Sequence, residues 1–296
     1  MTPRAAINGF TMIELLVTVV LSVVIAGAVS QMISRPMEAY ASSSHRAKLL
    51  DAANVASSLF TREIRGALPN SIRVGCSGQC IEFLRAIDGA RYRSAGPGDV
   101  LDFDPANADT QFEVIGPLVD GATIRTGSSA DDCRLGNADC IAIYNTGQIN
   151  SSAWNMDNIA TITTLASPFS TLGFNNGGFS SGDTAFPVAS PQQRFHIVSG
   201  PISYVCDTTA GTLRRYDSYP ISASHSSVDS DAELIALSAT AAVVSNKLSA
   251  CDFDYDPGSL TRSGLVSFRM TISESVGSGH SESISLIKQA HVNNAP

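Results

Sequence analysis

The chain has 296 residues, of which 44% are apolar and 16% are charged, so it can bury a sizeable core in one or two domains. Its formal net charge is -8, whereas a nucleic-acid-binding surface would need a basic face. The composition therefore argues against nucleic acid as a partner and leaves most other classes of protein open.

The first predicted element is a long apolar helix near the N-terminus. From Phe10 to Ile33 the only charged residue is Glu14, and as a helix this segment would cross a bilayer of about 30 Å. A carboxylate inside such a segment is costly in lipid, so Glu14 is a candidate functional residue. An ordinary secretory signal would have a shorter apolar region followed by an A-x-A-like cleavage site, which this sequence lacks.

The same segment resembles the class III signal of type IV pilins and pseudopilins, through Arg4, Gly9, Phe10, Thr11 and Glu14. The resemblance implies that a prepilin peptidase cuts between Gly9 and Phe10 and methylates the new N-terminus. It implies that the apolar helix is a membrane anchor and later part of a filament core, where Glu14 pairs with the N-terminal amine of a neighbouring subunit. The implied partners are other minor and major pilins and an inner-membrane assembly platform, with no cofactor.

The charges that flank the apolar helix and the cleavage junction indicate opposite membrane orientations. Arg35, Arg46 and Lys48 lie beyond the apolar run and outnumber Arg4 before it, which by itself would place the large domain in the cytoplasm. The cleavage junction and the cysteines both require the opposite arrangement. We therefore expect a single-pass inner-membrane protein with a periplasmic C-terminal domain.

Six cysteines behind a membrane-targeting segment favour disulfides in an oxidising compartment. The short separations suggest Cys76 with Cys80 and Cys133 with Cys140, which leaves Cys206 with Cys251. Zinc binding is the alternative for the two close pairs. However, zinc sites usually repeat a pair of cysteines separated by two to four residues, and the C-x₃-C and C-x₆-C pairs do not repeat one spacing. No histidine lies near either pair.

A second helical segment follows the apolar run. Arg35-Pro36 permits a bend, and from Met37 to about Leu68 apolar residues recur every three or four positions. The predicted core face comprises Leu49, Ala53, Ala56, Phe60, Ile64 and Ala67. Gly66 and Pro69 are typical of a helix end. The sequence thus predicts one long helix whose second half lies on a globular domain.

From Ser71 onward, short runs rich in β-branched and aromatic residues predict an antiparallel sheet. Strands are predicted at 71–74, 81–85, 91–94, 100–103, 112–115, 123–126, 141–144, 194–199, 202–206, 212–216, 265–274 and 281–292. The last two should form a hairpin around 276–280, with Val266, Phe268, Met270 and Ile272 facing the core. Residues 127–191, apart from 140–144, are predicted to be largely surface loop, and 231–247 could be a short helix or a strand.

The end of the helix and the C-terminus narrow the resemblance to MshO-like minor pilins, which serve mannose-sensitive haemagglutinin (MSHA)-type pili and are related to PilW-type and type II secretion J-type pseudopilins. The similar residues are Arg46, Ala47, Leu50 to Ala53, Arg62, Arg65, Ala67 to Ser71, Arg73, Val74, Cys251, Phe253, Tyr255, Pro257, Gly258, Gly264 to Val266 and His291 to Pro296. The resemblance does not extend to residues 75–250. The larger domain, and the lack of the proline that many major pilins have in the first half of the helix, fit a minor subunit better than a major one.

This resemblance implies an α+β, pilin-like fold in which a long N-terminal helix packs on an antiparallel sheet. The expected organisation is a leader at 1–9, a transmembrane and filament-core helix at 10–36, an amphipathic half-helix at 37–69 and a periplasmic β-rich domain at 70–296.

One motif could indicate an enzyme. Gly178–Gly182 matches G-x-S-x-G, which would make Ser180 a catalytic nucleophile. The motif works only on a tight strand-to-helix turn, whereas this one lies in a Gly-, Asn- and Ser-rich tract. We therefore expect a non-enzymatic protein.

Asp252, Asp254 and Asp256 are weak candidates for a calcium site because alternate oxygen ligands suit Ca²⁺. In a calcium loop starting at Asp252, however, Pro257 replaces the required Gly and Ser263 replaces the required Glu. The alternative is a strand with solvent-facing aspartates.

The sequence therefore predicts a minor pilin or pseudopilin of MSHA-type pilus biogenesis, placed at or near the filament tip. A type II secretion pseudopilin is the closest alternative. A membrane-tethered adhesin, which would bind through its sheet and residues 145–190, is an alternative of another class, and a hydrolase acting through Ser180 is the weakest.

Overall fold

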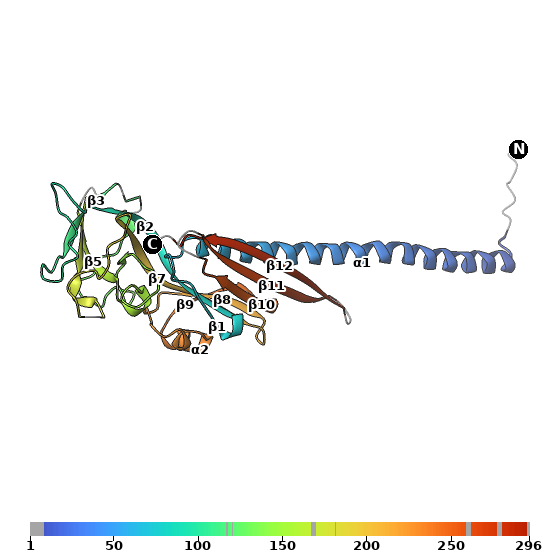
Figure 1. The fold of residues 1–296 in the computed structure, drawn as a ribbon. Helices are drawn as coiled ribbons and strands as arrows, with labels where there is room; N and C mark the ends of the chain where they lie inside the picture. Colours follow the sequence, from blue (N-terminus) through green and yellow to red (C-terminus); the bar gives the residue numbers. More distant parts are fainter. Residues whose placement is uncertain are drawn as a thin grey trace, which may run out of the picture.

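The structure, a computed structural model, describes residues 9–294 except 117, 120, 167–169, 181, 259–261 and 277–279. The expectations for the leader before Gly9, the tip of the last hairpin and the last two residues lie outside this part. Within it, one long helix leads from the N-terminal end into a β-rich globular part (Figure 1). The architecture is α+β and pilin-like, as the sequence predicts.

Helix α1 (Met12–Ile64) is a continuous helix of 53 residues, which corresponds to about 80 Å at 1.5 Å per residue. Pro36 lies inside it, so the proline does not divide the helix into two elements. The predicted core face is confirmed, because all six of its residues are at most 7% exposed. The helix ends just before Gly66, whose N–H donates to the carbonyl oxygen of Glu63 at 2.9 Å.

A three-stranded antiparallel sheet covers one side of this helix. Its strands, in spatial order, are β10 (Leu248–Asp256), β11 (Gly264–Val276) and β12 (His280–Val292). The predicted hairpin is confirmed: β11 and β12 pair from Gly264 with Val292 to Val276 with His280. The inward residues of β11 share a core with α1, where the ring centroids of Phe60 and Phe268 are 4.8 Å apart.

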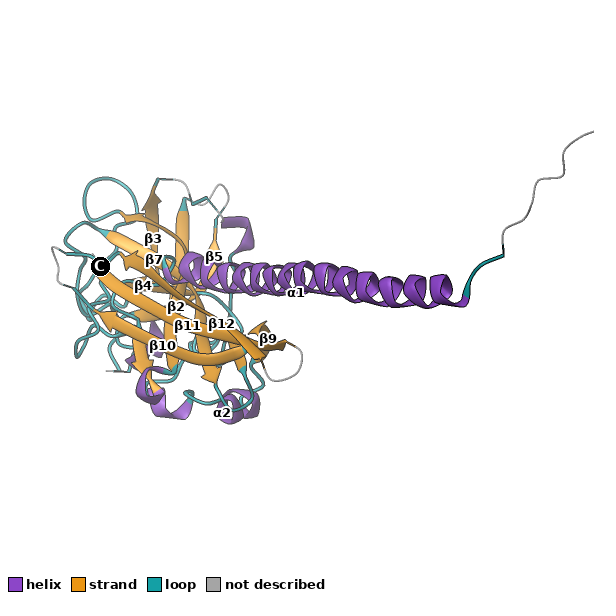
Figure 2. Cartoon of the chain, turned by 90° about the vertical axis from the view of Figure 1, so that its right-hand side faces the viewer, coloured by secondary structure: helices purple, strands orange, loops and turns teal. Residues whose placement is uncertain are grey.

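The second sheet has nine strands. They are β1 (Arg73–Gly75), β2 (Cys80–Tyr92), β3 (Gln111–Ile115), β4 (Cys140–Ile143), β5 (Ile159–Leu165), β6 (Thr171–Asn175), β7 (Arg194–Asp207), β8 (Thr212–Asp217) and β9 (Thr240–Ser245). Their order is β1-β2-β3-β6-β5-β4-β7-β8-β9, and β2 also pairs with β7. Ile81, Phe83 and Tyr204 join the core of α1 and the three-stranded sheet. The C-terminal half of α1 is therefore packed among the strands, while its N-terminal half projects away from them (Figure 2).

Beyond the end of α1 the nine-stranded sheet closes into a barrel. Consecutive pairings β2–β3, β3–β6, β6–β5, β5–β4, β4–β7 and β7–β2 form a ring of six strands. The ring encloses its own core, whose largest side chains are Tyr92, Phe112, Phe174, Phe186 and Phe195. Ring closure pairs both edges of these strands. The barrel lies at the end of the molecule opposite the N-terminus (Figure 1).

The barrel corrects part of the prediction that 127–191 is largely loop. Strands β5 and β6 lie in this segment and complete the ring. Both strands are short and lie in Ser-, Gly- and Asn-rich surroundings, and they pair with β4 and β3, respectively. Conversely, the strands predicted at 100–103 and 123–126 are wrong: these segments are irregular or form a 3₁₀ turn, and Leu101 and Ile124 pack on the barrel core.

Other predicted strands change in extent. The runs at 81–85 and 91–94 belong to β2, and those at 194–199 and 202–206 belong to β7. Both strands are long because one half of each lies beside α1 and the other half belongs to the barrel. Residues 231–247 contain a short helix, α2 (Asp231–Ala236), as well as β9.

Three disulfides join Cys76 to Cys80, Cys133 to Cys140 and Cys206 to Cys251, the pairs suggested by their separation. The last links β7 to β10 and hence the two sheets. The others close local turns before β2 and β4.

Candidate functional site

Thr11 and Glu14 shape the start of helix α1. Thr11 is the N-cap, and its side-chain oxygen accepts the N–H of Glu14 at 3.3 Å. The Thr11 hydroxyl also donates to Glu14 Oε2 at 3.4 Å. Thr at the N-cap followed three residues later by Glu is the sequence pattern of a capping box, but here Glu14 accepts the Thr11 hydroxyl. Gly9 and Phe10 precede the cap as exposed, non-helical residues.

The first part of α1 is uncovered by the rest of the protein. Met12–Ile33, 22 residues with a mean hydropathy of 2.5, is long and apolar enough to cross a membrane, and none of it is buried. The hydroxyls of Thr18 and Ser22 donate to backbone carbonyls one turn back, at 2.9 and 2.7 Å. Glu14 is therefore the one ionisable side chain in this span. Lipid or other helices must cover the apolar surface of this span.

Residues 4–30 match the family model of the prokaryotic N-terminal methylation motif. This motif is typical of type IV pilins and pseudopilins. The motif implies processing by a prepilin peptidase and assembly with other pilins, and together with the apolar helix it indicates an inner-membrane anchor. Pilin-like proteins are normally not enzymes. No curated protein and no solved structure matches the chain significantly.

Ser180 lies in an arrangement that does not resemble a nucleophile elbow. It follows a 3₁₀ turn, Asn176–Gly178, rather than a strand. Its hydroxyl donates to Asp157 Oδ1 at 2.5 Å, and its N–H donates to the carbonyl of Met156. Residue 181 of the motif lies outside the described residues. The hydroxyl is thus bound to an aspartate, whereas a catalytic serine needs a histidine base.

The three candidate calcium ligands lie on strand β10 rather than in a loop. Between them Phe253 is buried, so Asp252, Asp254 and Asp256 share the opposite face of the strand. Asp256 accepts the N–H of Gly258 at 3.0 Å and the guanidinium of Arg262 at 2.9 Å. The three aspartates therefore stay weak candidates for calcium, as the sequence indicates.

Among the described residues, Cys76, Cys80 and Asp229 have potential ligand atoms within 4.8 Å of one another. The two sulfurs are bonded to each other, so neither is the thiolate that zinc would need.

A buried ion pair joins β1 to β2 beside the end of α1. Glu82 is 0% exposed and accepts hydrogen bonds from Arg73 Nε at 2.6 Å and from the hydroxyl of Tyr219 at 2.8 Å. Burial raises the pKa of Glu82, and the ion pair with Arg73 opposes that rise. The sequence contains only a weak signal for this pair, a single carboxylate in the otherwise apolar start of β2.

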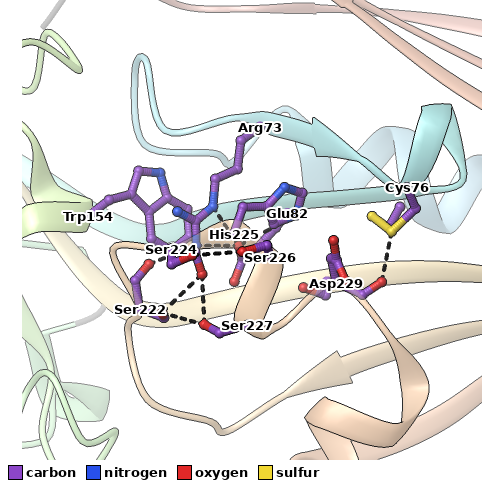
Figure 3. Close-up of polar contacts among 12 residues, drawn as sticks. Arg73, Cys76, Glu82, Trp154, Ser222, Ser224, His225, Ser226, Ser227 and Asp229 are labelled. Carbon is purple, nitrogen blue, oxygen red and sulfur yellow. Dashed lines mark hydrogen bonds and ion pairs between the residues drawn. A yellow bond between two sulfur atoms is a disulfide. The ribbon is translucent and has the colours of Figure 1, made fainter.

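Arg73 also organises the neighbouring loop (Figure 3). Its terminal nitrogens donate to the carbonyls of Ser222 at 2.7 Å and Ala223 at 2.9 Å. Its guanidinium carbon lies 3.7 Å from the ring centroid of Trp154. One side chain therefore connects β1, β2, the 220–227 segment and the segment before β5.

Two partly buried histidines are neutral in the folded protein. Burial lowers the pKa of His225 to about 4, and the charge of Arg73 contributes to this shift. The pKa of His196 is lowered to about 4 by burial and by Arg194. His225 Nε2 is 3.9 Å from Glu82 Oε2, but burial outweighs this attraction because no hydrogen bond joins them.

We expect the protein to lose stability as the pH falls from about 6.5 toward 4. The unfolded chain binds a proton on each of these histidines near pH 6.5, whereas the folded chain does so only near pH 4. Unfolding therefore takes up protons in this window, and the free energy of unfolding decreases as the pH falls. Trp154, the single tryptophan, can report denaturant titrations of the detergent-solubilised chain by fluorescence. His225→Asn should reduce the pH dependence, and an unchanged slope would contradict the assignment.

Proposed function

We propose that this chain is a minor pilin of an MSHA-type type IV pilus, incorporated at or near the filament tip. In this proposal residues 1–9 are the leader, 10–36 the transmembrane and filament-core helix, 37–69 its amphipathic continuation and 70–296 the periplasmic domain. The observation that carries it is the methylation motif at the start of a capped, uncovered helix that continues into the core of the domain.

The continuous helix explains how such a subunit could leave the membrane. None of its first 22 residues, Met12–Ile33, is buried by the described part of the protein, so lipid can cover them before assembly and neighbouring helices afterwards. Its later residues are locked between two sheets. The domain and the anchor therefore move as one body when the helix is extracted.

The barrel supports a position at the filament end. It extends the domain past the C-terminal end of α1, away from the N-terminus (Figure 1). In a filament of parallel helices, a subunit nearer the tip would lie in this direction. A bulky closed barrel there fits a terminal subunit better than an internal one.

The mature protein is expected to begin with N-methylated Phe10. The exposed, non-helical Gly9 and Phe10 leave their peptide bond accessible to a peptidase. Mass spectrometry of the protein isolated from membranes with and without an active prepilin peptidase measures this directly. Cleavage beyond Ile33, or no cleavage in the presence of the peptidase, would overturn the proposal.

A type II secretion pseudopilin would share the same helix and the same processing. A deletion strain distinguishes the two functions, because loss of the chain should stop piliation in one case and protein secretion in the other.

A further inference from the structure

Two arginines face each other on the outer surface of the barrel. Arg91 of β2 and Arg194 of β7 are directly opposite in the antiparallel ladder. The next residue of each strand, Tyr92 and Phe195, is buried in the barrel core, so the two arginines point outward. Side chains opposite each other in a ladder have Cβ atoms about 5 Å apart, and like charges in this arrangement are destabilising.

Neither guanidinium has a hydrogen-bond or ion-pair partner among the residues that the structure describes. Arg93, which directly follows the end of β2, differs. Arg93 lies opposite the carboxylate of Glu113 and binds it through Nε and a terminal nitrogen, both at 2.9 Å. The fold therefore supplies a counter-ion to Arg93 and leaves the neighbouring arginine pair without one.

The arginine pair lines a pocket of about 530 Å³. His196 and Asp88 also line it, so two guanidinium groups accompany one carboxylate. Asp88 Oδ1 accepts the N–H of Gly89 at 2.7 Å. Arg194 and His196 are two residues apart on β7 and therefore share its outer face. The charge of Arg194 helps to lower the pKa of His196. His196 Nε2 is buried without a hydrogen-bond partner.

The shape of the pocket depends on Gly89, which lies opposite His196 in the ladder. A Cβ at this position would be 2.9 Å from the carbonyl oxygen of Phe195 and 3.3 Å from His196 Nδ1. The absence of a side chain keeps the pocket open over the imidazole. On the far side of Arg91, the ladder partner Ile115 on β3 is 44% exposed and provides an apolar border.

We propose that this pocket binds the oxyanion of a small ligand, a carboxylate or a sulfate, between Arg91 and Arg194. Guanidinium groups bind such planar or tetrahedral oxyanions through paired N–H donors. A bound anion would relieve the repulsion between the two arginines. The backbone of β2 is already paired with β3 and β7 here, so recognition must come from side chains rather than from an added strand.

The oxyanion belongs either to an acidic sugar or to a free inorganic anion. Both would accept hydrogen bonds from the same guanidinium N–H groups. The exposed apolar side chain of Ile115 beside the two guanidinium groups favours the sugar, whose ring has apolar faces. The barrel lies farthest from the membrane anchor, where an external glycan is accessible (Figure 1). This inference does not depend on which filament or secretion system the chain serves.

Titration calorimetry on the full chain in detergent tests the proposal with four probes: trigalacturonate, sulfated maltotriose, neutral maltotriose and inorganic sulfate. We expect the acidic saccharides to bind and neutral maltotriose not to bind. Arg91→Gln and Arg194→Gln should each weaken binding at least tenfold. Arg65→Gln, which removes an exposed arginine at the end of α1, is the matched control and should bind as the wild type does.

A stability measurement separates lost binding from misfolding. Without ligand, Arg91→Gln should unfold at the same temperature as the wild type or higher, because the substitution removes a like-charge contact. Binding of inorganic sulfate as tight as that of the sulfated saccharide would assign the site to a free anion. Equal binding of neutral maltotriose, no binding of any anionic probe, or full binding by both arginine variants would overturn the proposal.

Discussion

Glu14→Val is expected to leave membrane insertion and cleavage intact and to abolish incorporation of the subunit into pili. The carboxylate lies in the first turn of α1, in a span with no other ionisable side chain. In the membrane it lies near the end of the span, close to the headgroups. Inside a bundle of helices it is removed from water and needs a positive partner. In our proposal the freed amine of Phe10 in a neighbouring subunit supplies that charge.

Valine would leave the amine of the neighbouring subunit unpaired in an apolar bundle. Removing one partner of a buried ion pair costs roughly 3–5 kcal/mol. Such a loss corresponds to a fall in incorporation of about a hundredfold to a few thousandfold. Immunoblots of sheared pili against membrane fractions, together with pilus counts by electron microscopy, would measure it.

Two further variants isolate the charge from other roles of this side chain. Glu14→Gln keeps a polar group for the capping box but removes the charge, and it should fail in the same way. Ser22→Val changes another polar residue of the span, whose hydroxyl bonds only its own helix, and should assemble normally. Normal piliation by Glu14→Gln would show that the cap rather than the charge matters, and normal piliation by Glu14→Val would refute the proposed ion pair.

The parts of the fold that the sequence predicts are those with a regular local period. The helix face from Leu49 to Ile64 repeats every three or four residues because one side of α1 is buried between two sheets. Val266 to Ile272 alternate because β11 is buried on one face only. The processing motif is likewise local, since Gly9, Phe10 and Glu14 lie within one short segment.

The barrel could not be predicted in the same way because its closure depends on distant pairings. Phe112 pairs with Leu172, and Arg91 pairs with Arg194, and neither register can be read from either segment alone. Strand β6 contains a glycine, and β5 has two adjacent threonines, Thr163 and Thr164, so both resemble their loop surroundings. The arginine pocket is hidden for the same reason, because its two charges are brought together only by the register of β2 and β7.

Arg73→Ala is expected to destabilise the β-rich globular part by about 3–5 kcal/mol, since it would leave Glu82 buried without its cation. The substitution also removes the donors to Ser222 and Ala223 and the contact with Trp154. A domain is typically stable by only about 5–15 kcal/mol, so this is a large share. Denaturant titrations followed by the fluorescence of Trp154 would measure the loss, with a spectral shift because its environment changes too.

A double-mutant cycle shows how much of the loss belongs to the unpaired carboxylate. Glu82→Gln in the Arg73→Ala background removes the charge and should restore part of the stability. Arg93→Ala is the matched control, because it breaks an arginine–glutamate pair on the barrel surface whose side chains are 25% and 31% exposed. It should cost far less, since water can solvate the remaining carboxylate. Equal losses for Arg73→Ala and Arg93→Ala would contradict the importance of burial.

The pH dependence of the Arg73→Ala variant gives an independent test. Burial already raises the pKa of Glu82 above 4.5, and without Arg73 that pKa should rise further. Between the unfolded and the raised folded pKa, the folded variant holds a proton that the unfolded chain does not. Its deficit relative to the wild type should therefore be largest at neutral pH and shrink as the pH falls toward 4.5. Loss of Arg73 also removes a charge that keeps His225 neutral, which acts in the same direction. A deficit that stays constant with pH would mean that lost packing on Trp154, rather than the unpaired buried charge of Glu82, causes the instability.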